Sequence, residues 1–393
     1  SVERQSTSDP LVQSLAEPLG AGPLHSLVRA GNKVAIVVSD CTRAINTADL
    51  LPPVMRELEK GGVHTDDVTV IVGLGVHEPN TPESFQRILG SYYGRLKAVD
   101  HDAFSDEALT YLGRTSYNTE VIVNRKVVES DFRILIGQVE PHIFAGYSGG
   151  RKSILPGVSA ERTIVHNHKP EMLMHPLARV GVIDGNPISE DMEEAAAMVG
   201  PEFAVNAILD ERGVATCVTC GALTPSHRAA VSIVRERAQV AIPDRADVVI
   251  CKPPPPLDTT LYQAVKAIMH CEDAVRDGGE IILYARCKEG IGSEDMMKAF
   301  RMSGGIEHLA EVVREIYTIQ MDHALLLSRL MMRGVTITVV SENVDPKDLA
   351  AMYVQSKSSL TEAFEAAIER VQGQPKVAVF PRATSIMPVI VRR

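Results

Sequence analysis

The chain has 393 residues, of which 45% are hydrophobic and 23% are charged, and its formal net charge is −10. This length is sufficient for two domains with cores of their own, and the composition is that of an ordinary globular protein. Because no basic block is present and no apolar run approaches the roughly 18 residues that span a bilayer, we expect neither a nucleic-acid partner nor a membrane.

Two features bear on the cellular compartment. The first residues, Ser1–Gln5, are polar and lack the form of a signal peptide. The six cysteines are scattered, which is unlike a disulfide framework, so we expect a reducing, cytoplasmic location. Cys217 and Cys220 form a C-x-x-C pair without the partners of a zinc site, and we expect this pair to be incidental.

Strand and helix patterns alternate along the first part of the chain. Apolar runs rich in β-branched residues predict strands, and amphipathic runs predict helices. The expected elements are, in chain order, a strand at 33–39, a helix at about 50–60, a strand at 68–72, a helix at 82–89 and a strand at 132–136. Apolar strands joined by helices predict a mainly parallel sheet with both faces covered.

A second α/β segment is expected from about residue 242. Its predicted strands are 246–251, 280–284, 335–340 and 376–380. A four-proline turn follows the first of them, after which Asp258 or Thr259 can cap a helix. We therefore predict two α/β domains, 1–241 and 242–393, with mainly parallel sheets and an active-site cleft between them. The tail 385–393 can return to the first domain.

Three predicted strands of the first domain deliver polar residues just beyond their carboxyl ends. Asp40 and Arg43 follow the first strand, His77 follows the second and His142 follows the third. Ligands of open α/β sheets bind at this edge, so we predict a ligand site there. Arg43 can bind a carboxylate or phosphate, although a local ion pair with Asp40 is equally compatible. Each histidine can act as an acid or base, or can be an ordinary surface residue.

A short turn of small residues, Ser148-Gly149-Gly150, lies shortly after His142 and leads to Lys152. Such a turn lets backbone amides approach a ligand, and a lysine beside it can hold an anion or form a covalent bond. Only two residues separate Gly146 from Gly149, whereas a phosphate loop needs four, so we exclude a nucleoside-triphosphatase.

Two further groups carry candidate functional residues. His166 and His168 form an H-x-H pair, and one of the two imidazoles can bind a metal. Alternatively, the pair is part of a polar loop without a function. Tyr262 and Lys266 are expected to share one helix face beside Gln263, where they can hold an anion or remain solvated. The remaining histidines, among them His227 and His323, are assigned no role.

Taken together, these separated motifs resemble the nickel-dependent lactate racemase family, and the resemblance spans most of the chain. The motifs are Asp40-x-x-Arg43, Gly75-x-His77, Glu140-Pro141-His142, Ser148-Gly149-Gly150-x-Lys152, Pro156-Gly157, His168 and Tyr262-Gln263-x-x-Lys266. The family uses a nickel pincer nucleotide, a pyridinium-3,5-bisthiocarboxylic acid mononucleotide that holds nickel. The resemblance implies a racemase or epimerase of small, lactate-like 2-hydroxy acids, served by enzymes that make the cofactor.

The resemblance also implies a role for each residue. Lys152 would bind the cofactor covalently, His168 would ligate nickel, and His77 and His142 would be opposed acid/base residues. The substrate carboxylate or cofactor anions would be held by Arg43, Tyr262, Gln263 and Lys266. The nucleotide would be seated by Asp40, Arg43, Ser148, Gly149 and Gly150.

The chemistry that the resemblance implies is reversible hydride transfer through a planar 2-keto acid, since the α-proton beside a carboxylate is very weakly acidic. Glu78 departs from the family, in which a basic residue follows the loop histidine. We expect Glu78 to raise the pKa of His77 and to disfavour a second negative charge on the substrate. Two alternatives remain: a zinc hydrolase that uses His77, His142 and His168, and a non-catalytic protein that binds small carboxylates.

Overall fold

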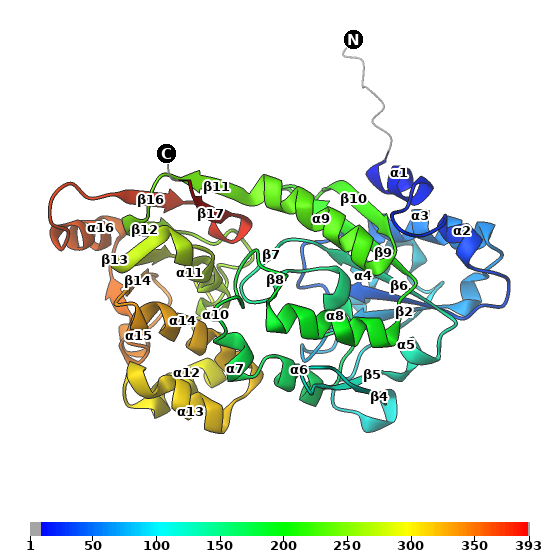
Figure 1. Ribbon diagram of the computed structural model, residues 1–393, viewed down its shortest axis with the longest axis horizontal. Helices are drawn as coiled ribbons and strands as arrows, with labels where there is room; N and C mark the ends of the chain where they lie inside the picture. Colours follow the sequence, from blue (N-terminus) through cyan, green and yellow to red (C-terminus); the bar gives the residue numbers. More distant parts are fainter. Residues whose placement is uncertain (1–8, 392–393) are drawn as a thin grey trace, which may run out of the picture. The chain divides into compact units, whose positions relative to one another are not determined.

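The computed structural model describes residues 9–391, which form two compact units (Figure 1). The first unit contains the described residues up to Glu140, together with Tyr147–Asn167 and Ser189–Val234. The second contains Pro141–Gly146, His168–Ile188 and the described residues from Arg235 onward. Ser1–Gln5, which bear on the question of a signal peptide, lie outside the described residues, as do the last two residues of the predicted tail.

A six-stranded sheet with the order β10-β9-β6-β1-β2-β3 forms the centre of the first unit. Its strands are β1 (Val34–Ser39), β2 (Val68–Gly73), β3 (Lys97–Asp100), β6 (Phe132–Gln138), β9 (Phe203–Leu209) and β10 (Ala215–Gly221). Neighbouring strands pair in parallel, except that β10 runs antiparallel to β9. The winding reverses between β1 and β6, and such a reversal marks the ligand-binding edge of an open sheet.

Helices and a hairpin accompany this sheet. The hairpin pairs β4 (Leu109–Arg114) with β5 (Glu120–Asn124). The helices are α1 (Pro10–Ala16), α2 (Leu24–Leu27), α3 (Thr47–Lys60), α4 (Pro82–Leu89), α5 (Arg125–Glu129) and α6 (Glu161–Asn167), with most of α8 (Pro187–Val199) and α9 (Leu223–Ala238). Helix α3 shows why they form: it buries one face, including Leu51, Val54 and Leu58, in the core against the sheet.

The second unit contains a five-stranded parallel sheet with the order β15-β14-β13-β12-β16. Its strands are β12 (Ala246–Cys251), β13 (Val275–Tyr284), β14 (Thr336–Val340), β15 (Gln355–Lys357) and β16 (Val377–Phe380). Its helices are α7 (Pro170–Leu173), α10 (Leu261–Ala264), α11 (Lys266–His270), α12 (Glu294–Ser303), α13 (Leu309–Ile316), α14 (Asp322–Met332), α15 (Pro346–Ala351) and α16 (Leu360–Glu369).

The predicted fold class, α/β with mainly parallel sheets, is confirmed. The predicted tail forms β17 (Met387–Ile390), which pairs in parallel with β11 (Gln239–Ile242). The boundary at residue 242 stays a prediction, because each of the two compact units is built from several separate segments of the chain. In the described part of the chain, no helix combines the length and the apolar character needed to cross a membrane.

One local prediction was wrong. Neither Asp258 nor Thr259 caps the helix after the proline turn, because Thr260 does so by accepting the Gln263 N–H at 3.3 Å. Asp258 instead accepts a hydrogen bond from the Arg286 Nε at 2.6 Å, and the Thr259 hydroxyl donates to the Pro256 carbonyl oxygen.

Candidate active site

Two of the predicted site residues, Asp40 and His77, contact each other in the first unit. The His77 Nδ1 lies 2.6 Å from the Asp40 Oδ2, and the other carboxylate oxygen accepts hydrogen bonds from the Thr42 N–H and hydroxyl. Asp40 is buried, whereas the side chain of His77 is 47% exposed. Since a carboxylate can only accept, Nδ1 carries the proton of neutral His77 and Nε2 presents a lone pair.

This contact revises two expectations about charge. The carboxylate that contacts His77 is that of Asp40, whereas Glu78 is exposed. Among residues 9–391, the structure records no ion pair between Asp40 and the exposed Arg43, because His77 and Thr42 occupy the Asp40 carboxylate. The Arg43 side chain follows the end of β1 and is available for an anion.

The contacts of Asp40 predict a pH dependence of stability. Burial raises the pKa of Asp40, but the hydrogen bond and charge of His77, the charge of Arg43 and the Thr42 hydroxyl outweigh it and lower the pKa from 3.8 to about 2. Because the folded-state pKa is depressed, this stabilisation is present above pH 3.8 and is lost as the pH falls towards 2. It amounts to about 2 kcal/mol at neutral pH.

We therefore expect the free energy of unfolding of the wild type to fall more steeply than that of Asp40→Asn between about pH 5 and pH 2. Denaturant titrations at a series of pH values measure this difference. Parallel pH profiles for the two proteins would contradict the assigned contact.

The loop of His77 and the segment of Lys152 are joined within the first unit. The Gly75 N–H donates to the Gly157 carbonyl oxygen at 2.9 Å, and the Gly157 N–H donates to the Lys152 carbonyl oxygen at 3.1 Å. A Cβ on Gly157 would lie 2.3 Å from the Ser153 carbonyl oxygen, so this close approach requires glycine. The backbone therefore brings the segments of two predicted functional residues side by side.

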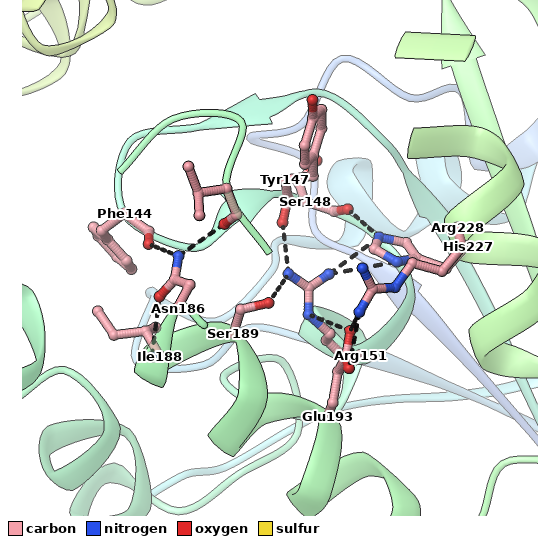
Figure 2. A network of polar contacts seen from close by, with 11 residues as sticks. Phe144, Tyr147, Ser148, Arg151, Asn186, Ile188, Ser189, Glu193, His227 and Arg228 are labelled. Atoms are coloured by element: carbon pink, nitrogen blue, oxygen red, sulfur yellow. Dashed lines mark hydrogen bonds and ion pairs between the residues drawn. The ribbon is translucent and has the colours of Figure 1, made fainter. Parts of the chain in front are cut away.

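Ser148 ties the small-residue turn to the end of β6. Its hydroxyl donates to the Gln138 carbonyl oxygen and accepts the Glu140 N–H, each at 2.9 Å. Its own carbonyl oxygen lies 2.9 Å from the Nε2 of His227 on α9 (Figure 2). Burial and the nearby Arg151 lower the pKa of His227 to about 3, so this histidine is neutral and donates from Nε2.

Arg151, which precedes Lys152, is the largest fully buried side chain among the described residues. Its guanidinium donates to the Ser189 hydroxyl at 2.8 Å and lies 3.8 Å from the Glu193 carboxylate, which Arg228 also contacts (Figure 2). Burial lowers the pKa of Arg151 to about 10, so the group stays charged near neutral pH. This buried network fixes the turn that presents Lys152, and no sequence motif pointed to it.

Gly149 and Gly150 are required by packing. Both have positive φ angles, of 74° and 51°. A Cβ on Gly149 would lie 2.6 Å from the Val139 Cγ2, and one on Gly150 would lie 2.7 Å from the His227 Cδ2. Packing against the protein therefore accounts for both glycines without a ligand.

Gly150→Ala is expected to reduce the free energy of unfolding by about 3 kcal/mol, because the new methyl group meets both backbone strain and the His227 ring. Gly94→Ala is a matched control, since Gly94 has a φ of 74° but no atom lies within 4 Å of the position that its methyl group would take. The control should cost only about 1 kcal/mol. Equal losses in urea denaturation would show that His227 does not restrict this turn.

In the second unit, Phe144 lies between two predicted histidines. Its ring makes edge contacts with His142 and His168, with ring centroids 4.6 Å and 4.8 Å apart. The His142 Nδ1 accepts the Ala145 N–H at 3.3 Å, so neutral His142 carries its proton on Nε2. His142 is therefore complementary to His77, whose Nε2 presents a lone pair.

The turn that carries Phe144 is braced by Asn186, which no sequence motif singled out. The Asn186 amide donates to the carbonyl oxygens of Phe144 at 2.7 Å and Val182 at 2.9 Å, and its side-chain oxygen accepts the Ile188 N–H (Figure 2). Gly146 in this turn approaches Val182 so closely that a Cβ would lie 2.0 Å from its carbonyl oxygen. Phe144 and its two histidine neighbours are thus held on a fixed turn.

The H-x-H pair divides in the structure. His166 lies in the last turn of α6, and its Nε2 lies 3.3 Å from the Tyr117 carbonyl oxygen. His168 follows the helix and is 4% exposed, with its ring held against Phe144. The two imidazoles therefore have different surroundings, and His168 is the one that shares a neighbour with His142.

The predicted anion-binding face after the proline turn is interrupted. Helix α10 ends at Ala264 and α11 begins at Lys266, so Tyr262 and Lys266 do not lie on one continuous helix. The Lys266 Nζ donates to the Gln263 Oε1 at 2.6 Å, and the Tyr262 ring packs against His323. His323 in turn contacts Asp322, and no motif in the sequence had selected this buried pair.

The residues present fit a cofactor that is linked to a lysine and whose metal has one imidazole ligand. They fit less well a metal ion held by several protein side chains. Among the described residues, no group of three or more His, Cys, Asp or Glu side chains is arranged to hold a metal ion. His168 is a buried, oriented imidazole, which suits nickel, and Lys152 is a half-buried amine on a fixed turn. The resemblance requires one imidazole nitrogen to ligate the metal and one lysine amine to bind the cofactor.

Comparison with known families decides the identity. Residues 2–181 match the lactate racemase N-terminal domain, and residues 242–389 match the lactate racemase C-terminal domain. The chain belongs to the lactate racemase family. As a family member, it is an isomerase of the racemase type. This assignment supports neither of the two alternatives, the zinc hydrolase and the non-catalytic binding protein.

Two lactate racemases are similar to this chain over almost their whole length. The proteins from Thermoanaerobacterium thermosaccharolyticum and Lactiplantibacillus plantarum are each 29% identical over 97% of this chain, which aligns with 90% and 91% of their lengths. The structure of the lactate racemase apoprotein from T. thermosaccharolyticum matches with a TM-score of 0.92 over 97% of this chain and 92% of that chain.

A structure with lower sequence identity to this chain has a similar fold. A crystal structure of a protein from Thermotoga maritima matches with a TM-score of 0.70 and 18% identity, over 98% of this chain and 99% of that chain. At this identity the likeness shows the fold alone.

Proposed function

We propose that the protein racemises a 2-hydroxy acid with a short, uncharged side chain, such as lactate, using a nickel pincer nucleotide attached to Lys152. One observation carries the proposal: His77, oriented by buried Asp40, lies on a loop whose backbone is hydrogen-bonded to the Lys152 segment. This arrangement supports the proposal because it joins the loop of an oriented histidine to the segment of the lysine that would bind the cofactor. The racemases that match the chain over 97% of its length support the reaction class.

The two histidines have complementary protonation for moving a proton on and off the substrate oxygen. Neutral His77 can take the hydroxyl proton at Nε2, while Asp40 stabilises the imidazolium that forms. Neutral His142 can hold the oxygen of a planar 2-keto acid through a hydrogen bond from its Nε2–H, and the His77 imidazolium returns the proton to that oxygen when the α-carbon is reduced again. The bound cofactor would supply the site that accepts the α-hydride and returns it to either face.

The remaining candidate residues would hold and orient the reactants. His168 would be the protein ligand of nickel, and its edge contact with Phe144 fixes the direction of its ring. Arg43 would bind the substrate carboxylate or a cofactor anion, together with Tyr262, Gln263 and Lys266. Asp40 and Ser148–Gly150 would help to seat the nucleotide through the backbone that they fix.

We further propose that the protein acts in the cytoplasm and receives its cofactor from maturation enzymes. All six cysteines are free thiols in the structure, as suits a reducing compartment.

The proposal is tested with protein co-expressed with the cofactor maturation enzymes. Incubation with L-lactate deuterated at C2 should yield D-lactate that keeps its deuterium, because hydride returns to the same carbon. Chiral chromatography with mass spectrometry measures both enantiomer and label. D-lactate that has lost its deuterium to water would indicate proton abstraction and contradict the proposed mechanism.

A further inference from the structure

A buried polar cluster lies beside Tyr262 in the second unit. It consists of Tyr317, which follows α13, and of Asp322 and His323, which begin α14. Asp322 Oδ1 lies 2.5 Å from the His323 Nδ1 and also accepts the His323 backbone N–H at 2.7 Å. With 2% of His323 and 4% of Asp322 exposed, the imidazole is held in one orientation.

Two atoms of this cluster have no hydrogen-bond partner among the described residues. They are the His323 Nε2 and the Tyr317 hydroxyl oxygen, and both atoms are buried. Buried polar atoms in native proteins almost always have a partner, whether from the protein, from water or from a ligand. A pair of them in one cluster therefore indicates a partner that is not part of the chain, which is either water or a ligand.

The cluster adjoins a residue that the proposed function assigns to substrate binding. The rings of His323 and Tyr262 have centroids 4.1 Å apart and planes tilted by 34°. Burial, followed by the charges of nearby Asp322 and Tyr262, raises the pKa of Tyr317 well above its ordinary value, so its hydroxyl stays protonated. The His323 ring thus lies against Tyr262, and Tyr317 lies within electrostatic range of the same residue.

The chemistry of the cluster favours a neutral hydroxyl as the missing group. Asp322 holds the proton on the His323 Nδ1, so the Nε2 of neutral His323 accepts a hydrogen bond, and the Tyr317 hydroxyl can donate one. A hydroxyl group both donates and accepts, so it has the chemistry that the two atoms require. A carboxylate at this position would instead meet the buried Asp322, a charge of the same sign.

We propose that His323 and Tyr317 bind a hydroxyl group on the substrate side chain. The preferred substrate class would then be a 2-hydroxy acid with a second hydroxyl, for which 2,3-dihydroxypropanoate is the simplest probe. This inference rests on the proposed function and deepens it by naming the side chain that the same site selects.

The test compares racemisation of L-2,3-dihydroxypropanoate and L-lactate by the cofactor-loaded protein. The wild type should prefer the dihydroxy acid by about tenfold or more in kcat/KM, because a site built to bind a hydroxyl discriminates against the analogue that lacks it. His323→Met and His323→Gln form a matched pair of similar volume. The methionine variant should lose the preference, and the glutamine variant, which keeps a polar end, should retain part of it.

A wild type without preference for the dihydroxy acid, or a methionine variant with the wild-type ratio, would overturn the inference while leaving the racemase intact. Racemisation of neither acid would overturn the proposed function itself. Since His323→Met leaves Asp322 without its partner, the double variant Asp322→Asn/His323→Met carries the same test if the single variant does not fold.

Discussion

His77→Ala is expected to lower kcat for racemisation by about 10²–10⁴-fold, the range that a positioned acid or base contributes. The side chain of His77 is half-exposed, so its removal opens no cavity in the core, although buried Asp40 loses a partner; circular dichroism of the variant checks that it is folded. The substrate KM should change little, because the binding residues are retained. Steady-state kinetics with the loaded enzyme measure both parameters.

Asp40→Asn separates orientation from proton transfer. Asparagine can accept from the His77 Nδ1 but carries no charge to stabilise the imidazolium, so we expect a smaller loss of kcat than for His77→Ala. A His77→Ala enzyme with wild-type kcat, or an Asp40→Asn enzyme slower than His77→Ala, would contradict the assignment of the base.

His168→Ala is expected to reduce bound nickel from near-stoichiometric to trace levels, since the cofactor would lose its protein ligand. The measurement is the metal-to-protein ratio after gel filtration of the co-expressed protein. His166→Ala is the matched control: it lies two residues away, and its Nε2 contacts the Tyr117 carbonyl oxygen.

The control should keep its nickel. Wild-type nickel in His168→Ala, or loss of nickel in His166→Ala alone, would move the ligand assignment away from His168. A lowered ratio in both variants would indicate damage to α6 instead of loss of a ligand.

Much of the fold and of the candidate site could be predicted from the sequence. The strands at 34–39, 68–73 and 132–138 are mostly apolar, and their neighbouring places in the sheet order bring Asp40 and His77 to one edge. A parallel sheet places successive strand ends at the same edge, so a one-dimensional pattern was sufficient there.

The missed residues act through contacts between distant parts of the chain. His227 bonds to Ser148 across 79 positions, and His323 meets Tyr262 from a different helix. In the sequence, each is an isolated histidine in an amphipathic helix, and no local pattern distinguishes it from a packed core residue. The split between α10 and α11 was missed because helical spacing continues through Val265 without a glycine or proline.

The most direct measurement of the central claim is intact-protein mass spectrometry combined with nickel analysis, after co-expression with the cofactor maturation enzymes. We expect an adduct of the cofactor's mass that maps to Lys152, near-stoichiometric nickel, and neither in Lys152→Arg, which keeps the positive charge but cannot form the linkage. An unmodified Lys152 without nickel, in cells that load a known lactate racemase, would contradict the proposed cofactor attachment.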